Sequence, residues 1–249
     1  RRTEMNSSSI TKELEKERIK VSCPQEAKNI SEDLDLVIYS AAVTDENPEL
    51  IEARLKQIRT LSRKEALPII LGDKKNYCVA GAHGKSTTTA ILATILQSSA
   101  LIGAISKEFG SNFRYVDKTV AFEADESDAS FLLSNPYCAI VTNAEPEHME
   151  YYHYDYDKFY ESYETFLSLA KKRVVNGEDK DIQKLKIEDA TYLYPSKDIK
   201  NLCYTLKDGQ PCTKFDLKDY GTFEVWGFGF HIASNASLAI MAALNELDI

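Results

Sequence analysis

The sequence predicts an α/β protein with two domains, and three observations point to this fold class. The chain has 249 residues, which exceeds the usual size of one domain, and its 43% hydrophobic and 28% charged content is ordinary for a globular protein. Short apolar runs alternate with segments of helical periodicity, which is the pattern of a mostly parallel sheet. One such run, residues 77–80, is followed by a glycine-rich turn and then by a helical segment.

Charge and hydropathy exclude several classes of protein. The net charge is -9 and the charges are interspersed, so a polyanion such as a nucleic acid is not an expected partner. The longest helix-like apolar run, residues 90–96, is far shorter than the roughly 20 residues of a membrane helix, so membrane insertion is not expected. Residues 1–17 are polar and lack the apolar core of a signal peptide, which predicts a cytoplasmic protein.

The five cysteines are odd in number and widely spaced, and none forms a CxxC pair. Neither disulfides nor a structural zinc site is therefore expected. Cys78 and Cys138 lie inside apolar runs, where a reduced thiol behaves as a small hydrophobic side chain.

Residues 1–75 are predicted to form an incomplete Rossmann-like domain. Residues 11–19 have helical periodicity, and residues 35–40 have the profile of a strand buried in a parallel sheet. Asn47 and Pro48 supply the cap and the first-turn proline of the next helix. The chain starts in a polar stretch with no opening strand and no glycine-rich first turn, so the beginning of such a domain is missing.

A polar and turn-prone linker is expected at residues 72–76. Residues 76–249 are predicted to form a P-loop-type domain with a mostly parallel sheet. Turn residues within the β-rich stretch 202–230 indicate hairpins that form an antiparallel β edge. A last helix is expected over residues 234–247. The other expected elements are strands at 77–80, 100–104, 119–124, 137–142 and 173–175 and helices at 86–96 and 158–170.

The turn after residues 77–80 is the most informative segment. Gly81 and Gly84 are followed by Lys85 and Ser86 and then by the apolar helix. This order favours a phosphate cradle, because backbone amides and the positive helix end face the phosphates, the lysine reaches the β and γ groups, and the hydroxyl can hold magnesium. Two residues separate the glycines instead of the usual four, and Val79 stands where the first glycine is common. The alternative is a tight turn with a solvated lysine.

Polar side chains follow two further strands. Residues 123–128 hold four carboxylates, which repel one another unless a cation such as Mg²⁺ neutralises them. Because ligands gather at the carboxyl edge of an open α/β sheet, this cluster should lie near the phosphate loop. The alternative is a solvated acidic loop. The next predicted strand is followed in the same way by Asn143, Glu145, Glu147 and His148.

Together these motifs resemble the Mur ligase family. The resemblance rests on GAHGKSTT at residues 81–88, EADESDASF at 123–131, NAEPEH at 143–148, and residues 39–42 with Asn47, Pro48 and Glu49, and it runs from about residue 7 to the end of the chain. It implies an ATP-dependent, amide-bond-forming ligase of peptidoglycan synthesis. In that family ATP phosphorylates a carboxylate, and an amine then displaces the phosphate.

The acidic motif is most similar to the family members that join L-alanine to the lactyl carboxylate of UDP-N-acetylmuramate. The resemblance therefore implies ATP, UDP-N-acetylmuramate and L-alanine as substrates and Mg²⁺ as cofactor. Two alternatives stay open at this point. One is a ligase that recycles a murein tripeptide onto the same sugar nucleotide, and the other is a nucleotide-binding module without catalysis.

The resemblance also implies roles for individual residues. Lys85, Glu126 and His148 would be catalytic, and Ser86, Glu126 and His148 would hold magnesium. ATP would be bound by Gly81, Ala82, His83, Gly84, Lys85, Ser86, Thr87, His231 and Asn235. The sugar substrate would be bound by Ser40, Asn112, Arg114, Ser127 and Asp128.

The sequence departs from the family pattern at several points. Phe230 and Ile232 replace an arginine and an asparagine that flank His231 in the family, and Glu147 and Glu150 stand where aspartate is usual. The family's opening glycine-rich segment and its third domain, which carries the amino-acid site, are both absent from this sequence.

Overall fold

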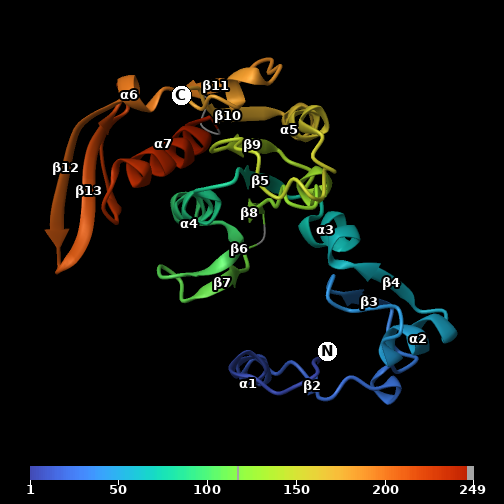
Figure 1. Ribbon diagram of the computed structural model, residues 1–249. Helices are drawn as coiled ribbons and strands as arrows, with labels where there is room; N and C mark the ends of the chain where they lie inside the picture. The colour runs from blue at the N-terminus through green and yellow to red at the C-terminus, as the bar shows by residue number, and fades with distance from the viewer. Residues whose placement is uncertain (117, 246–249) are drawn as a thin grey trace. The chain divides into compact units, whose positions relative to one another are not determined.

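The computed structural model describes residues 1–116 and 118–245, and the chain divides into two compact units, residues 1–70 and 71–249 (Figure 1). The first unit contains two small parallel sheets. Strand β1 (Arg2–Thr3) pairs with β2 (Val21–Ser22), and β3 (Leu36–Tyr39) pairs with β4 (Arg59–Ser62). Its helices are α1 (Ser9–Lys16), the 3-10 helix η1 (Ala27–Asn29), α2 (Pro48–Leu55) and α3 (Arg63–Leu71), which ends in the second unit.

Helix α2 begins at the predicted cap, and its Glu49 side chain contacts two other elements of the first unit. Asn47 Oδ1 accepts a hydrogen bond from the amide of Glu49, which closes the first turn. The Glu49 carboxylate is buried and accepts hydrogen bonds from Thr3 Oγ1 at 2.6 Å and Asn29 Nδ2 at 2.8 Å. One buried carboxylate therefore ties α2 to β1 and η1.

Two expectations for the first unit are wrong. A short strand, β1, does precede α1, although its residues carry no apolar pattern. Strand β3 is not buried on both faces, because Ile38 is 45% exposed, and β4 is its single pairing partner among the described residues. Two further elements, β4 and α3, have no sequence pattern that predicts them, and the interior of α3 contains Pro68.

The second unit is built on a seven-stranded sheet in the order β11–β10–β9–β5–β8–β6–β7. All neighbouring strands pair in parallel except β6 and β7, so the predicted mostly parallel sheet is confirmed. The strands are β5 (Lys75–Ala80), β6 (Ser99–Ser106), β7 (Ser111–Arg114), β8 (Thr119–Glu123), β9 (Cys138–Val141), β10 (Lys172–Asn176) and β11 (Thr191–Leu193). Residues 75 and 76 of the expected linker thus belong to the central strand.

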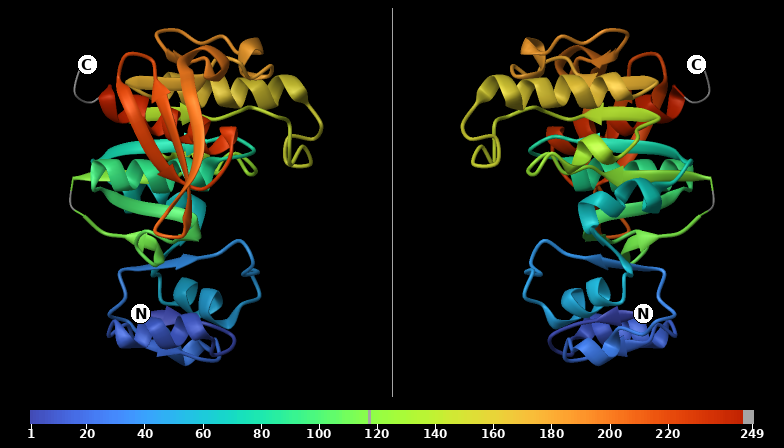
Figure 2. Two further views of the ribbon diagram at one scale, coloured as in Figure 1. Left: turned by 90° about the vertical axis from the view of Figure 1, so that its left-hand side faces the viewer. Right: turned by 90° about the vertical axis from the view of Figure 1, so that its right-hand side faces the viewer.

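Helices cover both faces of this sheet (Figures 1 and 2). On one face α4 (Lys85–Leu96) packs against α7 (Phe230–Leu244), and on the other lie α5 (Tyr156–Leu169) and η2 (Ser130–Leu133). Alternate side chains of β5 point to opposite faces of the sheet. Tyr77 and Val79 pack in the core under α4 and α7, while the Cys78 thiol lies on the other face, 3.7 Å from the carbonyl oxygen of Ser134. The remaining short helices are η3 (Ile182–Lys184) and α6 (Pro195–Asp198).

The predicted hairpins form a sheet of their own. Strands β12 (Ile199–Lys207), β13 (Gln210–Leu217) and β14 (Gly221–Trp226) pair in antiparallel fashion and turn at Asp208 and Gly209, both with positive φ. This sheet packs on α7 through buried Phe215 and Leu217, so it is not the edge of the main sheet. The antiparallel edge is β7, which the sequence did not indicate. Within the described residues, no helix has the length and apolar character needed to cross a membrane.

Candidate functional site

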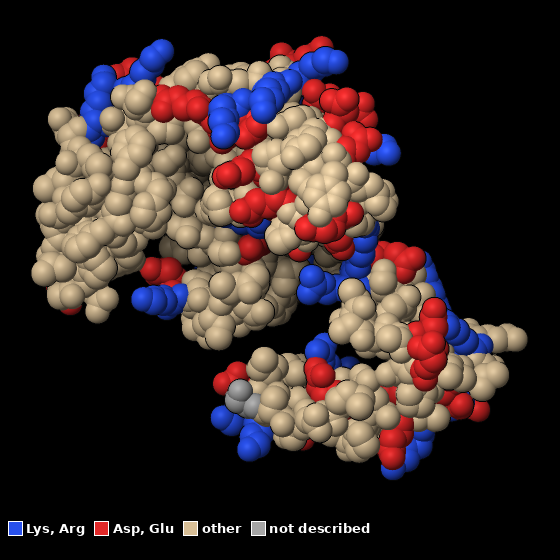
Figure 3. All heavy atoms as spheres, viewed as in Figure 1, with Lys and Arg blue, Asp and Glu red and all other residues tan. Residues whose placement is uncertain are grey.

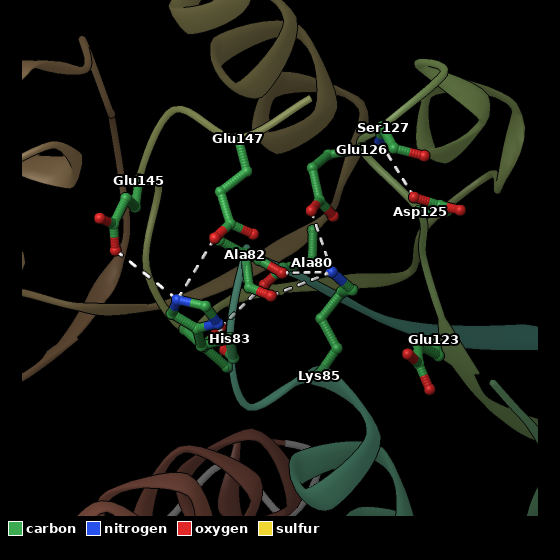
Figure 4. A network of polar contacts seen from close by, with 12 residues as sticks. Ala80, Ala82, His83, Lys85, Glu123, Asp125, Glu126, Ser127, Glu145 and Glu147 are labelled. Carbon is green, nitrogen blue, oxygen red and sulfur yellow. Dashed lines mark hydrogen bonds and ion pairs between the residues drawn. The ribbon is translucent and has the colours of Figure 1, made fainter. Parts of the chain in front are cut away.

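Three strand ends meet at one edge of the main sheet. Strand β5 has β8 on one side and β9 on the other, and all three run in parallel. The loops that follow them therefore lie side by side, as the sequence predicts for residues 81–86, 123–128 and 143–148 (Figure 4).

The two glycines of the phosphate loop occupy positions that a side chain would disrupt. Gly81 has φ 134°, and a Cβ atom there would fall 2.2 Å from Thr142 Oγ1. Gly84 has φ 85° and caps α4, and a Cβ atom there would fall 2.6 Å from Asn235 Oδ1. The structure therefore brings Asn235, on α7, against the loop in which Ala82 and His83 also lie.

Lys85 begins α4 and points back over the loop. Its Nζ donates to the carbonyl oxygen of Gly81 at 2.6 Å and to Glu126 Oε1 at 2.9 Å. The side chain of Glu126 is only 3% exposed, and its other carboxylate oxygen is buried with no hydrogen-bond partner among the described residues. Burial raises the pKa of Glu126, and the positive charge of Lys85 only partly offsets this effect. A buried oxygen without a partner marks a place where a further cation or donor fits.

Ser86 contacts a carboxylate at the end of β8. Its Oγ donates to Glu123 Oε1 at 3.0 Å, and Glu123 Oε2 accepts a hydrogen bond from the Gly103 amide at 2.7 Å. The family resemblance assigns magnesium to Ser86, Glu126 and His148, and it names Glu123 only as a member of the acidic cluster. The position of Glu123 as the last residue of β8 is the signal that could have identified it.

The loop after β8 is shaped by its own side chains. Asp125 Oδ1 accepts a hydrogen bond from the amide of Ser127, and Asp128 Oδ1 accepts one from Ser130. Burial alone would raise the pKa of Asp125, but the bonds from Ser127 and the charges of Lys85 and His148 lower it overall. Ser127 and Asp128, two of the predicted substrate residues, thus lie in the loop that carries Glu126.

His83 has two partners that its spacing did not reveal. Its Nε2 lies 3.7 Å from Glu145 Oε2 and 3.5 Å from Glu147 Oε1 (Figure 4). His148, which ends this segment, has φ 53°, an uncommon backbone conformation for a residue with a side chain. The phosphate loop and the loop that carries His148 are thus joined by acidic and basic side chains. Figure 3, drawn in the view of Figure 1, shows several acidic side chains on the face of the second unit that is turned toward the viewer.

The other three predicted substrate residues lie outside these loops in the sequence. Ser40 follows β3 in the first unit. Asn112 and Arg114 lie in the edge strand β7, where the Arg114 guanidinium donates to the carbonyl oxygens of Ser98 at 2.8 Å and Ala93 at 2.5 Å. The geometry thus gives Arg114 a structural role at the end of α4.

The predicted adenine contacts lie at the start of α7. The His231 side chain is exposed and its ring lies against Gly229, while Ile232 packs against Gly227. Thr87 and Ser86 contribute to the lining of a cavity of about 1010 Å³, formed mainly by apolar side chains of α4, β6, α7, β13 and β14.

The oxygen-rich donor set suits magnesium in character. Among the described residues no group of three or more His, Cys, Asp or Glu side chains is arranged as a metal site. The Ser86 hydroxyl and the Glu123 and Glu126 carboxylates are nevertheless hard oxygen donors of the kind that Mg²⁺ takes with its own waters, and the unpartnered Glu126 oxygen suits contact with a cation. The residues present therefore fit this ion.

Two family models match the chain, and curated relatives are similar to most of it. The family model "Mur ligase middle domain" matches residues 79–243, and "Mur ligase family, catalytic domain" matches residues 3–75. The UDP-N-acetylmuramate–L-alanine ligase of Campylobacter curvus is 55% identical over 248 residues, which cover 99% of this chain and 57% of that protein. The enzyme of the same name from Helicobacter pylori strain P12 is 49% identical over 93% of this chain and 51% of its own length. The chain thus spans between about half and three fifths of these relatives.

Solved structures show the same architecture. The UDP-N-acetylmuramate–alanine ligase of Thermotoga maritima superposes with a TM-score of 0.80 at 26% identity, over 99% of this chain and 59% of that one. The UDP-N-acetylmuramate:L-alanyl-gamma-D-glutamyl-meso-diaminopimelate ligase of Neisseria meningitides has a TM-score of 0.76 at 21% identity, over 97% and 84%, and so shares the fold. The sequence motifs, the loop geometry and the two matching family models together show that this chain belongs to the Mur ligase family.

Proposed function

We propose that the protein is an ATP-dependent ligase that joins L-alanine to the lactyl carboxylate of UDP-N-acetylmuramate in peptidoglycan precursor synthesis. The observation that carries this proposal is the phosphate loop of the second unit, where Lys85 and Ser86 each meet a carboxylate from β8 or the loop after it. The names of the Campylobacter and Helicobacter relatives support the choice of substrates. Both ATP and a uridine-linked sugar are cytoplasmic metabolites, so we place the protein in the cytoplasm.

The chemistry follows from the poor reactivity of a carboxylate. A lactyl carboxylate oxygen attacks the γ-phosphorus of ATP, the bond to the β-γ bridging oxygen breaks, and ADP leaves. The amine then attacks the carbonyl carbon of the acyl phosphate, the carbon–oxygen bond to phosphate breaks, and the ammonium proton passes to solvent or phosphate. The products are the amide, ADP and phosphate, so one ATP is consumed for each bond formed.

The residues of this chain act mainly by placing positive charge and donors around the phosphates. The first amides of α4 have no acceptor within the helix, and they face the loop. Lys85 would leave Glu126 and Gly81 to neutralise charge on the transferred phosphoryl group. Ser86, Glu123, Glu126 and His148 would hold magnesium, which supplies further neutralisation of the phosphate oxygens. Ser40, Asn112, Arg114, Ser127 and Asp128 remain candidates for contacts with the sugar nucleotide.

A murein tripeptide ligase on the same sugar nucleotide is the second candidate. It is favoured by the fold shared with the Neisseria enzyme, of which this chain covers 84%. Both candidates need the same phosphate loop, so the amine substrate separates them. A nucleotide-binding module without catalysis is the third candidate, but the intact set of Lys85, Ser86, Glu126 and His148 speaks against it.

The test is phosphate release from MgATP in the presence of UDP-N-acetylmuramate, with L-alanine, glycine, L-serine or the tripeptide added in turn. Release that requires both the sugar nucleotide and L-alanine supports the proposal. Release that requires the tripeptide establishes the second candidate. Nucleotide binding without release under any of these conditions would make this chain a nucleotide-binding unit, and ligase activity would then have to be tested in a protein of the relatives' full length.

A further inference from the structure

We propose that Asn143 is a positioning residue that holds the phosphate loop in its binding shape, an inference that rests on the nucleotide binding proposed above. Asn143 follows β9, and its side-chain amide contacts the backbone of His83 twice. The His83 N–H donates to Asn143 Oδ1 at 3.1 Å, and Asn143 Nδ2 donates to the His83 carbonyl oxygen at 2.8 Å. Two bonds from one planar amide fix the peptide groups on both sides of His83.

The loop needs this support because its own residues do not define its shape. His83 lies between Gly81 and Gly84, and both glycines have positive φ, so the backbone on either side has unusual freedom. The neighbouring strand end removes that freedom. Thr142 Oγ1 lies 2.6 Å from the same His83 carbonyl oxygen, and it also occupies the space beside Gly81 where a Cβ atom would fall.

The contact also selects which amides face the ligand. Because the His83 N–H donates to Asn143 Oδ1, it is already engaged within the protein. The amides that remain for an anion include those at the start of α4, where the helix dipole favours negative charge. Losing Asn143 should therefore weaken recognition of the phosphates that lie in the loop and leave recognition of the nucleoside unchanged.

The experiment compares the affinities of ADP, ATP and AMP for the full chain with Mg²⁺ present, by competition against a fluorescent ATP analogue. Asn143→Ala should weaken the affinities for ADP and ATP by about tenfold or more, which is the effect expected from losing two hydrogen bonds. It should change the affinity for AMP by less than about twofold. Asn76→Ala is the matched control. It removes a side-chain amide that donates to the Asn135 carbonyl oxygen at 3.2 Å and lies in the same strand β5, away from its phosphate-loop end, so it should leave the ratio of ADP to AMP affinity unchanged.

Thr142 provides a second test that does not depend on the folding of the first variant. Thr142→Val loses the hydroxyl beside His83 and should weaken ADP relative to AMP, while Thr142→Ser keeps the hydroxyl and should bind like the wild type. The positioning role would be overturned if Asn143→Ala weakened the affinities for ADP and AMP equally. It would also be overturned if Asn143→Ala kept the wild-type affinity for ADP while Lys85→Ala lost it. Either result would leave the proposed function standing. A wild-type protein that binds neither ADP nor ATP would overturn the proposed function itself.

Discussion

At the scale of single residues, the site depends on a lysine whose charge serves two purposes. Lys85 Nζ is placed to meet phosphates, and until it does so it compensates a carboxylate that is almost fully buried. A buried carboxylate without a cation is costly, which is why burial raises the pKa of Glu126 even with Lys85 beside it.

Lys85→Ala should therefore abolish phosphate release and also lower the free energy of unfolding by about 1–3 kcal/mol at pH 7, without unfolding the protein. The double variant Lys85→Ala/Glu126→Gln should recover most of that stability and none of the activity, because the uncompensated carboxylate is gone. Urea denaturation and phosphate release measure the two effects. Equal stability of the single and double variants would show that Glu126 does not depend on Lys85.

A second residue-scale prediction concerns Asp181, a buried carboxylate near η3. Its Oδ1 accepts hydrogen bonds from Lys184 Nζ at 2.6 Å and Tyr160 OH at 2.8 Å. Burial alone would raise its pKa, but these two partners lower it overall. A lowered pKa in the folded state stabilises the protein above the unfolded-state pKa, and that contribution is lost as pH falls through the folded value.

Asp181→Asn should thus destabilise the protein by about 1–2 kcal/mol at neutral pH, and the difference from wild type should shrink as pH falls below about 4. Thermal unfolding of both proteins across the range from acidic to neutral pH gives this difference directly. A difference that stays constant over the whole range would mean that the charge of Asp181 does not contribute.

At the scale of elements, the loop between β5 and α4 requires its first glycine. A Cβ atom at Gly81 would meet Thr142 Oγ1 at 2.2 Å and the Asn143 carbonyl oxygen at 2.8 Å, at a φ that side chains rarely adopt. Gly209, in the hairpin between β12 and β13, also has positive φ, but a Cβ atom there would meet nothing within 4 Å among the described residues.

Gly81→Ala should therefore lower stability more than Gly209→Ala, which should cost only about 1 kcal/mol for its positive φ. Gly81→Ala should also lose ADP affinity, while Gly209→Ala should retain it. Thermal unfolding and a nucleotide titration of the two variants measure these effects. Similar stability and affinity in both variants would show that Thr142 does not constrain the loop.

The elements that the sequence predicted well are those whose pattern is local. The buried strands β5, β8 and β9 and the capped helix α2 each follow from a few consecutive residues. Strand β7 and helix α3 were missed because neither has a clear apolar period, and α3 contains a proline. These elements depend on neighbours that lie elsewhere in the chain.

The same distinction applies to the site. The phosphate loop could be predicted because its glycines, lysine and hydroxyl are consecutive. The pairing of Ser86 with Glu123 could not be predicted, because the two residues are far apart in the sequence. The Glu123 side chain also accepts a hydrogen bond from the amide of Gly103, which lies beyond the last residue of β6 that pairs with β8. The partners of His83 lie about 60 residues away, so no local spacing indicates them.

At the scale of the whole molecule, the two compact units correspond closely to the two matching family models. The units divide between residues 70 and 71, and the models cover residues 3–75 and 79–243. The phosphate loop and both carboxylate-bearing loops belong to the second unit, so this unit contains the three loops of the candidate phosphate site. Its chemistry is therefore the central claim to test.

The most direct measurement follows oxygen from the substrate to the released phosphate. UDP-N-acetylmuramate labelled with ¹⁸O in the lactyl carboxylate is incubated with MgATP and L-alanine, and the ¹⁸O content of the products is measured by mass spectrometry. An acyl phosphate predicts that each released phosphate carries one carboxylate oxygen and that ADP carries none. Unlabelled phosphate, or label that appears in AMP, would contradict carboxylate activation by phosphoryl transfer at this loop.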